Sequence, residues 1–554
     1  MSTLHFKHWP SHLPKTLALP ATSVYSNLEI SVLRYPARPV IHFYGRSLTY
    51  TAFKDTVDSV AGHLAGACGV SSGDRVVLYM QNSPQFMIAC YAIWRCDAVV
   101  VPVNPMNLAS ELRHYLSDSE AKVAIVGQEL IGNLRPLLDD GTLKHAVVAT
   151  YSDYLPDEAH FPIPDAARAP RAVLDHPALS GWSDACQASA PARPHRAGPD
   201  DLAVLLYTSG TTGNPKGCVH THRSTQATAI GAAVTCNAIP DHVYLAAVPM
   251  FHVTGFQHCM NMPVYAGAST VIMTRWDRDA AGQLIKHYGV TCWINIPTMV
   301  IDLLASPRFD EYDITTLAYL GGGGAAMPEA VARRLRELTG LDYLEGYGMS
   351  ETMSQTHWNP RHKPKPQCCG MPVFDTESRV VDPETLRELG PGETGEILSH
   401  GPQVMREYWK NPQATAEAFV HLDGKRFLRT GDLGRYDEDG YFFMVDRLKR
   451  MINAAGFKVW PAEVESMMYK HPDVQEACII GVPDERKGES VRAVVVLKPD
   501  SRGRVSEADV IAWAKQNMAA YKCPASVEFV EALPKSGTGK IQWRILQEKA
   551  RSGG

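Results

Sequence analysis

The chain has 554 residues, too many for one hydrophobic core, so we expect several domains. Its composition, 45% hydrophobic and 20% charged, is that of an ordinary globular protein. The 54 basic and 59 acidic side chains leave a formal net charge of −5. A nucleic-acid partner requires clustered basic charge, so this balance argues against one.

The twelve cysteines are scattered and form no CxxC pair, which favours free thiols in a reducing compartment. Residues 1–20 lack the apolar core of a signal peptide, so we expect none. The longest apolar stretch, residues 86–103, contains Arg95, Asp97 and Pro102 and cannot span a membrane. We therefore expect a cytoplasmic protein, and reversible contact with a membrane surface stays open.

Apolar runs and helical patterns alternate from residue 48 onward. Phe53, Val57 and Leu64 share one helical face that ends before Gly69, and Ser83–Pro84 is a typical helix start. Further strands are expected at 76–80, 99–101, 123–126 and 202–206, and a helix at 110–116. This alternation predicts parallel sheets covered by helices on both faces.

The rhythm breaks at residues 151–200, where eight prolines predict a long exposed connection without a packing pattern of its own. It then resumes, with strands expected at 244–248, 270–273 and 291–294 and helices at 280–288 and 328–338. Gly, Pro and Asp recur between short apolar runs from 370 to 445, which predicts an antiparallel β subdomain. A smaller α+β part follows, with helices near 462–469 and 507–516 and strands near 477–480 and 491–497.

The stretch from Tyr207 to Gly217 packs three glycines, five hydroxyl side chains and Lys216 into eleven residues. Such a loop suits an anion, because glycines let backbone N–H groups turn inward and the lysine adds charge. It is not a Walker A loop, since Gly217 rather than Ser or Thr follows the lysine. An ordinary Gly/Thr-rich surface turn is the alternative.

Four other stretches carry chemistry-bearing residues, and each has an ordinary structural alternative. The first is 250–256, where the alternative for His252 is an ordinary core histidine. The second is the run of four glycines at 321–324, where the alternative is a simple turn. The third, 345–351, combines an aromatic, glycines and two carboxylates, and its structural alternative is a tight turn. Residues 429–434 and 445–458 are alternatively a β-turn and a charged surface.

Together with Pro534–Lys540, these stretches resemble the adenylate-forming superfamily of acyl-CoA synthetases, luciferases and nonribosomal adenylation domains, over about residues 30–546. The resemblance implies an α/β fold: a large N-terminal domain, 1–447, made of two βα-type subdomains with mainly parallel sheets and a β subdomain at 370–447. A small mobile α+β domain, 448–554, would follow. ATP, Mg²⁺ and CoA are the implied cofactor and cosubstrates.

The same resemblance implies roles for individual residues. The ATP phosphates would be held by Thr208, Ser209, Gly210, Thr211, Thr212, Lys216 and Ser350. The adenosine would contact Gly324, Ala325, Glu345, Gly346, Tyr347, Asp432 and Arg447, with Tyr347 on the ring and Asp432 on the ribose hydroxyls. Mg²⁺ would lie at Thr208 and Glu351, which with Lys540 form the catalytic set. The acid would lie against His252, Val253, Phe256, Gly322, Gly323, Gly348 and Met349, and CoA along Gly456, Phe457 and Lys458.

Lys540 and Mg²⁺ would neutralise the charge that develops when a substrate carboxylate attacks the α-phosphorus. Removing one such donor typically costs about 10²–10³ in rate. Rotation of the small domain at Lys449 would then withdraw Lys540 and admit the thiol. Three positions depart from the family pattern: Ser350 replaces Thr, Ala326 replaces Pro, and Asn453 replaces a lysine near the CoA phosphates.

The acid itself is less well defined by the sequence. Phe256 falls where fatty-acyl members place an aromatic gate, and the glycines at 321–323 predict a pocket wall without side chains. The pocket region also carries Val253 and several methionines, which are apolar and adaptable. We expect a medium- to long-chain fatty acid, with an aryl acid such as a cinnamate or benzoate as the alternative.

Two rivals come from other functional classes. One is an adenylating enzyme that passes its acyl group to a carrier protein or to an oxygenation reaction instead of CoA. The other is a catalytically silent binding protein, against which Lys216, Glu351 and Lys540 argue. The expected partners are a small-molecule acid, ATP and CoA, with no transmembrane segment; peripheral membrane contact and a homodimer stay open.

Overall fold

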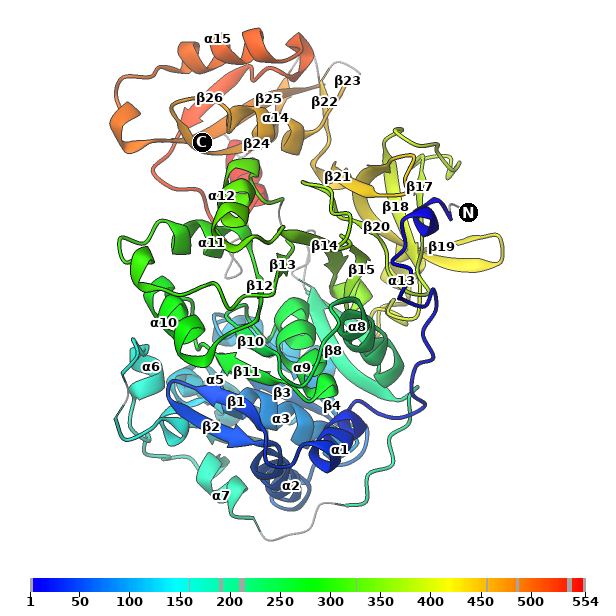
Figure 1. Cartoon of the computed structure of the whole chain (residues 1–554). Helices are drawn as coiled ribbons and strands as arrows, with labels where there is room; N and C mark the ends of the chain where they lie inside the picture. Colours follow the sequence, from blue (N-terminus) through cyan, green and yellow to red (C-terminus); the bar gives the residue numbers. More distant parts are fainter. Residues whose placement is uncertain are drawn as a thin grey trace. The chain divides into compact units, whose positions relative to one another are not determined.

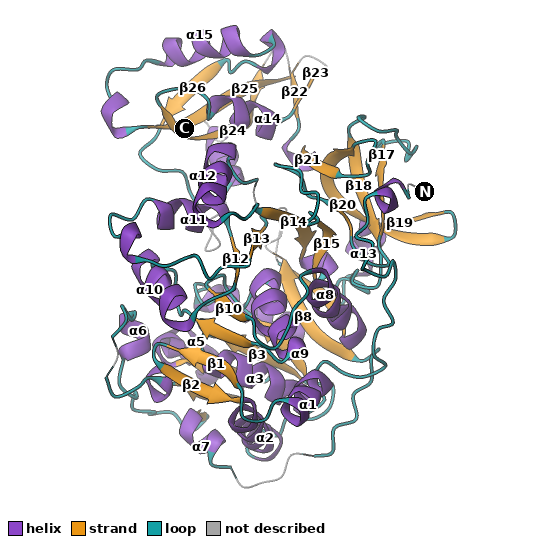
Figure 2. Cartoon of the chain, viewed as in Figure 1, coloured by secondary structure: helices purple, strands orange, loops and turns teal. Residues whose placement is uncertain are grey.

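A computed structural model describes residues 3–158, 160–188, 193–208, 215–324, 326–454, 457–484, 488–535 and 541–551. By internal contacts the chain divides into two compact units. The larger contains residues 5–377 and 400–419, and the smaller contains residues 1–4, 378–399 and 420–554. Helices and strands alternate through most of the larger unit, whereas the smaller unit contains a region built mainly of strands, β17 (Glu377–Val381) to β21 (Phe442–Arg447) (Figures 1 and 2).

The larger unit holds two mainly parallel sheets. In the described residues the first has the order β7-β6-β5-β3-β4-β8-β9, with the antiparallel β8–β9 pair at one edge. Its strands are β3 (Arg75–Tyr79), β4 (Val99–Pro102), β5 (Val123–Gly127), β6 (His145–Ala149), β7 (Leu179–Gly181), β8 (Leu202–Thr208) and β9 (Lys216–Thr221).

The second sheet of this unit has the order β16-β15-β14-β13-β12-β10-β11-β1-β2, parallel from β14 to β1. Its strands are β1 (Pro39–Phe43), β2 (Arg46–Thr49), β10 (Val243–Ala246), β11 (Ser269–Ile272), β12 (Cys292–Asn295), β13 (Tyr319–Gly322), β14 (Leu344–Met349), β15 (Ser354–Trp358) and β16 (Met371–Pro372).

Helices cover these sheets as the alternation predicts. They are α1 (Tyr25–Arg34), α2 (Tyr50–Gly66), α3 (Pro84–Arg95), α4 (Ala109–Ser119), α5 (Ile131–Asp139), α6 (Asp165–Arg168), α7 (Trp182–Cys186), α8 (His222–Thr235), α9 (Met262–Ala266), α10 (Arg278–Tyr288), α11 (Pro297–Leu304), α12 (Glu329–Thr339) and α13 (Pro412–Ala418). Ser83 caps α3 by accepting from the Phe86 N–H, with Pro84 in the first turn, so the predicted helix start is confirmed.

The cores follow from this layering. Helices α4 and α5 bury Leu112 and Leu134 against the first sheet. Helix α8 contacts β8 and β9, and its Ala232 and Ala233 pack with Tyr244 of β10 in the second sheet. Figure 1 shows α8 and α9 among the strands of this unit.

The smaller unit holds the β subdomain and the C-terminal part. The subdomain has β17 (Glu377–Val381), β18 (Gly395–His400), β19 (Phe419–Leu422), β20 (Lys425–Tyr436) and β21 (Phe442–Arg447), with antiparallel β18–β20 and β20–β21 pairs as predicted. The C-terminal part has β22 (Ile452–Ala454), β23 (Phe457–Val459), β24 (Val474–Asp484), β25 (Gly488–Leu497) and β26 (Ser526–Phe529), with α14 (Pro461–Met468), α15 (Glu507–Asn517) and α16 (Trp543–Arg551).

Strand β24 shows why both faces of the C-terminal sheet are covered. Ala477 and Ile479 pack with Val464 of α14 and Val510 of α15. Cys478, on the alternate face, packs with residues that include Trp543 of α16. This period of two places apolar side chains on both faces of the strand.

One predicted region is wrong. Residues 151–200 are not merely an exposed connection, because β7 pairs in parallel with β6 as the outer strand of the first sheet. Tyr151 is fully buried, and Trp182 at the start of α7 is 2% exposed. A three-residue Leu-Ser-Gly strand has no readable alternation, so its pairing depends on the neighbouring strand. No helix in the described residues is long and apolar enough to cross a membrane.

Candidate active site

The opening loop of the site joins β8 to β9. Thr208 ends β8 and Lys216 begins β9, and the two are Cα partners. Thr208, predicted for phosphate and Mg²⁺, and Lys216, predicted for phosphate, therefore lie at the two ends of this loop. Ser209, Gly210, Thr211 and Thr212 lie outside the described residues.

A segment that the motifs did not include pairs with the free edge of β9. The Val219 N–H donates to the Glu407 carbonyl at 2.9 Å, and the Trp409 N–H donates to the Gly217 carbonyl at 2.7 Å. Tyr408 lies between these contacts and forms an antiparallel backbone β-bridge with Cys218. The Lys216 Nζ is 4.6 Å from the centre of the Tyr408 ring, within the range of a cation–π contact.

Tyr408 also reaches Glu351, in the short turn η6 (Ser350–Thr352). Its hydroxyl donates to the Glu351 carboxylate at 2.8 Å. The Met405 N–H donates to the Glu351 carbonyl at 2.7 Å, so the segment holds both the side chain and the backbone of Glu351. Burial and the nearby Glu351 charge raise the pKa of Tyr408, so its hydroxyl keeps the proton that it donates.

His220 fixes the same turn from β9. It is fully buried, and burial lowers its pKa to about 4, so the ring is neutral. Its Nε2 lies 2.7 Å from the Ser350 carbonyl, which only accepts, so Nε2 carries the proton. The two residues after the η6 turn, Met353 and Ser354, have φ of 48° and 106°. This strained backbone closes the connection between β14 and β15.

The predicted glycines are explained by protein backbone rather than by an open pocket wall. A Cβ on Gly322 would lie 1.9 Å from the Asn295 carbonyl oxygen, and one on Gly323 would lie 2.6 Å from the Gly346 oxygen. On Gly348 it would meet the Ser354 oxygen at 1.7 Å. Neighbouring backbone therefore requires glycine at these positions, independently of any substrate.

Gly324 has a φ of 88°, which only glycine adopts readily, while Ala325 lies outside the described residues. Glu345, 7% exposed, supports this loop, since its carboxylate accepts from the Met327 N–H at 2.7 Å and the Cys368 N–H at 2.6 Å. Burial raises the pKa of Glu345 to about 7, partly opposed by these two hydrogen bonds.

Gly346 and Tyr347 follow on β14, paired with Trp358 and His357 of β15. The Tyr347 ring is half-buried and lies 5.5 Å from the fully buried His357 ring. The residues predicted to bind adenine, Glu345 to Tyr347, are thus consecutive on β14.

Three of the predicted acid-binding residues, His252, Val253 and Phe256, lie on or just before the π-helix η4 (Gly255–Asn261), whereas the others lie on or after β13 and on β14. Phe256 is fully buried, and its ring packs edge-on against Trp94, 5.8 Å away. Val253 is 2% exposed, whereas His252 and Met349 are half-buried. Gly255 is required because a Cβ would lie 2.3 Å from the Pro249 carbonyl oxygen.

The predicted ribose residues meet in the smaller unit. Asp432 of β20 and Arg447 of β21 are Cα partners, and Arg447 Nε lies 3.1 Å from the Asp432 carboxylate. Asp432 is buried, while about half of the Arg447 side chain is exposed. The pair therefore presents an oriented carboxylate beside a solvent-facing cation.

Lys449 is exposed in the single turn η7 (Leu448–Arg450) between β21 and β22. The next residue, Arg450, is anchored by ion pairs with Glu465 of α14 and a hydrogen bond to the Ile479 carbonyl at 3.2 Å. Phe457 and Lys458 lie in β23, with Lys458 opposite Asn453. Gly456 and Lys540 lie outside the described residues.

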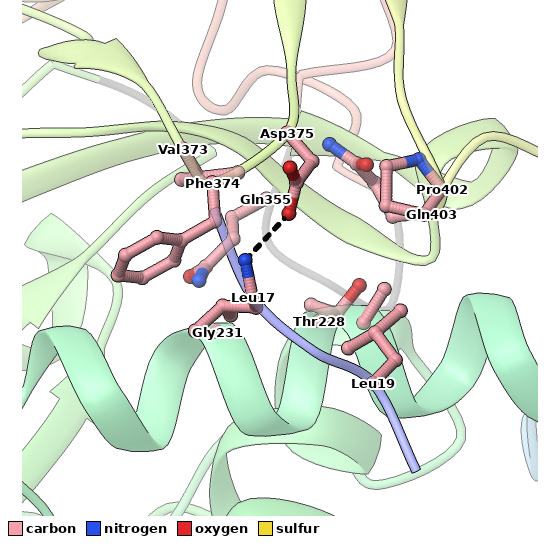
Figure 3. A pocket seen from close by; sticks show the side chains of 11 residues that line it. Leu17, Leu19, Thr228, Gly231, Gln355, Val373, Phe374, Asp375, Pro402 and Gln403 are labelled. Atoms are coloured by element: carbon pink, nitrogen blue, oxygen red, sulfur yellow. Dashed lines mark hydrogen bonds between the residues drawn. The ribbon is translucent and has the colours of Figure 1, made fainter. Parts of the chain in front are cut away.

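Two other features in the larger unit do not form the substrate site. Figure 3 shows the first, a cavity of about 10 Å³ beside α8. The Leu17 N–H donates to the Asp375 carboxylate there at 2.8 Å, and the cavity holds at most one water. The second is a Ser23–His195–Asp97 chain with contacts of 2.6 Å each, the connectivity of a hydrolase triad. Ser23 is 1% exposed, so no substrate reaches its hydroxyl.

Comparison with known proteins identifies the family of the chain. Residues 28–409 match the family model described as AMP-binding enzyme, and residues 463–540 match its C-terminal domain. The chain is 33% identical over 553 residues to a long-chain-fatty-acid–CoA ligase of Bacillus subtilis, covering 98% of both chains. It is 35% identical over 512 residues to a feruloyl-CoA synthase of an Amycolatopsis species, covering 91% of this chain and 94% of that one. ATP-bound MatB from Rhodopseudomonas palustris superposes with a TM-score of 0.83 at 28% identity, covering 96% and 99%.

Proposed function

The chain belongs to the AMP-binding enzyme family, and from this premise we propose that it activates a medium- to long-chain fatty acid and transfers it to CoA. The enzyme is an AMP-forming acid–thiol ligase that uses ATP and CoA. In such a reaction a carboxylate oxygen attacks the α-phosphorus and pyrophosphate leaves; the CoA sulfur then attacks the acyl carbon and AMP leaves.

The observation that carries the site assignment is the Tyr408 bridge. It holds the Glu351 carboxylate and contacts Lys216, next to the paired Thr208. A carboxylate and a hydroxyl are the hard oxygen donors that Mg²⁺ prefers, so Glu351 and Thr208 fit that cation. Bound there, Mg²⁺ would offset negative charge on the phosphates, while Lys216 adds a further cation.

The remaining roles rest on positions in the chain. Asp432 would accept from the ribose hydroxyls, with its orientation set by Arg447. Tyr347 would stack on the adenine, and Glu345 accepts a hydrogen bond from the Met327 N–H beyond Gly324. Lys540 would neutralise the substrate carboxylate and the α-phosphate during the first step.

The nature of the acid follows from the side chains assigned to its pocket. These carry no fixed charge: His252, Val253, Phe256, Gly322, Gly323, Gly348 and Met349. Phe256 and Val253 are apolar, as an acyl-chain pocket requires, and burial of each methylene contributes about 0.8 kcal/mol. A dicarboxylic or amino acid would leave its second charge unpaired there.

An aryl acid is the second candidate. The feruloyl-CoA synthase matches over most of the chain at an identity close to that of the fatty-acid ligase. The glycine run does not separate the two candidates, because neighbouring backbone requires glycine at 322 and 323 with either acid.

A panel of acids with CoA-dependent pyrophosphate release tests the proposal. We expect the highest kcat/KM for a fatty acid of medium or long chain, a lower value for ferulate and the lowest for acetate. A highest kcat/KM for acetate or an amino acid would refute the fatty-acid assignment. Stalled acyl-AMP without acyl-CoA would instead favour transfer to a carrier protein. A cytoplasmic location and a homodimer stay predictions.

A further inference from the structure

We propose that His63, Cys68 and His145 form a binding site for a zinc-like divalent cation in the larger unit. One ligand atom from each of the three side chains lies within 4.8 Å of the others. None of these residues belongs to the motifs that build the candidate active site. The site therefore represents a feature beyond the ligase reaction.

The local backbone brings the thiol to the first histidine. Helix α2 ends at Gly66, and the His63 carbonyl accepts from the N–H groups of Ala67 at 2.8 Å and Cys68 at 3.2 Å. Gly69 follows with a φ of 70°, which turns the chain away. Cys68 is therefore folded back onto the last turn of α2, near the His63 side chain.

The third donor comes from the first sheet. His145 begins β6 and is the Cα partner of Val123 in β5, so its position is set by the parallel pairing. His63 is 9% exposed, while Cys68 and His145 are half-buried. A cation at this point would join α2 and its following loop to the edge region of the sheet.

Ser180 of β7 supplies a competing explanation for the two histidines. Its hydroxyl lies 3.0 Å from His63 Nε2 and 3.2 Å from His145 Nε2. One hydroxyl can donate to one imidazole and accept from the other, so Ser180 satisfies both rings. This hydrogen-bond network does not include the Cys68 thiol, which provides the means to separate the two explanations.

The donor set selects the cation. Two imidazole nitrogens and one thiolate suit Zn²⁺ and Co²⁺, whereas Mg²⁺ and Ca²⁺ require oxygen donors. Zinc bonds of about 2.0–2.3 Å place tetrahedral donors roughly 3.5 Å from one another, so donors that already lie within 4.8 Å need only a small closure. As the metal–sulfur bond forms, the Cys68 proton leaves to solvent, and a water completes the coordination. Binding should therefore weaken as the pH falls.

The test is a Co²⁺ titration of the chelator-treated full-length protein, monitored by the thiolate-to-cobalt charge-transfer absorption. We expect one equivalent to bind with this absorption, and Zn²⁺ to displace it. Cys68→Ser should lack the absorption, and His145→Gln should weaken binding by more than the roughly 10–100-fold typical of an outer-sphere partner. Cys523→Ser, a cysteine in the smaller unit, is the matched control and should behave as wild type.

Ser180→Ala separates the metal site from the hydrogen-bond network. It removes the bridging hydroxyl but keeps all three donors, so the cobalt absorption should persist. Zn²⁺ should also raise the Tm of the wild type and of Ser180→Ala, but not of Cys68→Ser, because a ligand of the native state stabilises it. Absence of the absorption in the wild type, its persistence in Cys68→Ser, or its loss in Ser180→Ala would overturn the proposal.

Discussion

The Tyr408 hydroxyl donates to the Glu351 carboxylate over 2.8 Å, and this contact orients the side chain that we assign to the metal. The same ring lies 4.6 Å from Lys216 Nζ. One tyrosine outside the recognised motifs therefore links two residues that stand 135 positions apart in the chain, on β9 and η6.

Tyr408→Phe should slow acyl-adenylate formation about 10- to 100-fold, the effect expected for a hydrogen bond to a charged group. The ring and its contact with Lys216 are kept, so the loss reports on Glu351. The half-saturating Mg²⁺ concentration should rise in parallel, which a purely structural role would not cause. Tyr436→Phe, whose hydroxyl donates to the Leu389 carbonyl at 3.0 Å, is the matched control. Wild-type rates and Mg²⁺ dependence in Tyr408→Phe would contradict the assignment.

Asp432→Asn should raise the KM for ATP about 10- to 100-fold, because a neutral amide accepts less strongly from the ribose hydroxyls and loses its ion pair with Arg447. The KM values for CoA and the acid should change little. Steady-state kinetics with each substrate varied in turn measure this. Asp423→Asn removes an exposed carboxylate from a different ion pair, with Arg379, and controls for charge. An unchanged KM for ATP would exclude Asp432 from the nucleotide site.

Glu345 should make stability depend on pH. Its pKa is about 7 in the folded protein and about 4.5 ordinarily, so between these values the folded state holds a proton that the unfolded state has released. Stability from this group is thus complete below about pH 4.5 and is lost as the pH rises through 7, by roughly 3 kcal/mol.

The measurement is the Tm of the wild type minus that of Glu345→Gln, at intervals from pH 5 to pH 8. We expect this difference to fall as the pH rises. Glu337→Gln, on the exposed side of α12, should give a difference that varies much less with pH. A difference that stays level or grows with pH for Glu345→Gln would disagree with a raised pKa.

Lys449→Pro should spare acyl-adenylate formation and block thioester formation. Proline fixes the backbone φ in η7, whereas Arg450 remains anchored to Glu465 and the Ile479 carbonyl. Pyrophosphate release in single turnover reports the first step, and acyl-CoA appearance reports the second. Lys449→Ala, which keeps the backbone free, should retain both steps. Equal loss of both steps in the proline variant would argue against a hinge at this residue.

The sequence predicted the parts of the fold that depend on local pattern. The strand at 202–206 and the capped helix start at Ser83–Pro84 lie where periodicity and capping place them. The short strand β7 was missed because its pairing with β6 is supplied by the neighbour rather than by its own residues. The backbone contacts that require glycine at 321–323 could not be predicted for a similar reason, since adjacent strands supply them.

The candidate site, like the fold, could be predicted from the sequence only in part. The motifs predict Thr208, Lys216 and Glu351 as site residues, because their chemistry is visible in their residue types. Tyr408 carried no such signal, because its role arises only when residues 405–409 pair with β9 and meet the η6 turn. The roles of Lys540 and of the loop from Ser209 to Thr212 stay predictions.

The most direct test of the proposed substrate is a competition assay. Dodecanoate and ferulate at equal concentration are supplied with excess CoA and limiting ATP, and the acyl-CoA products are quantified by mass spectrometry. The ratio of products then equals the ratio of kcat/KM values for the two acids. We predict that dodecanoyl-CoA is the main product; predominance of feruloyl-CoA would contradict the fatty-acid assignment and establish the aryl acid in its place.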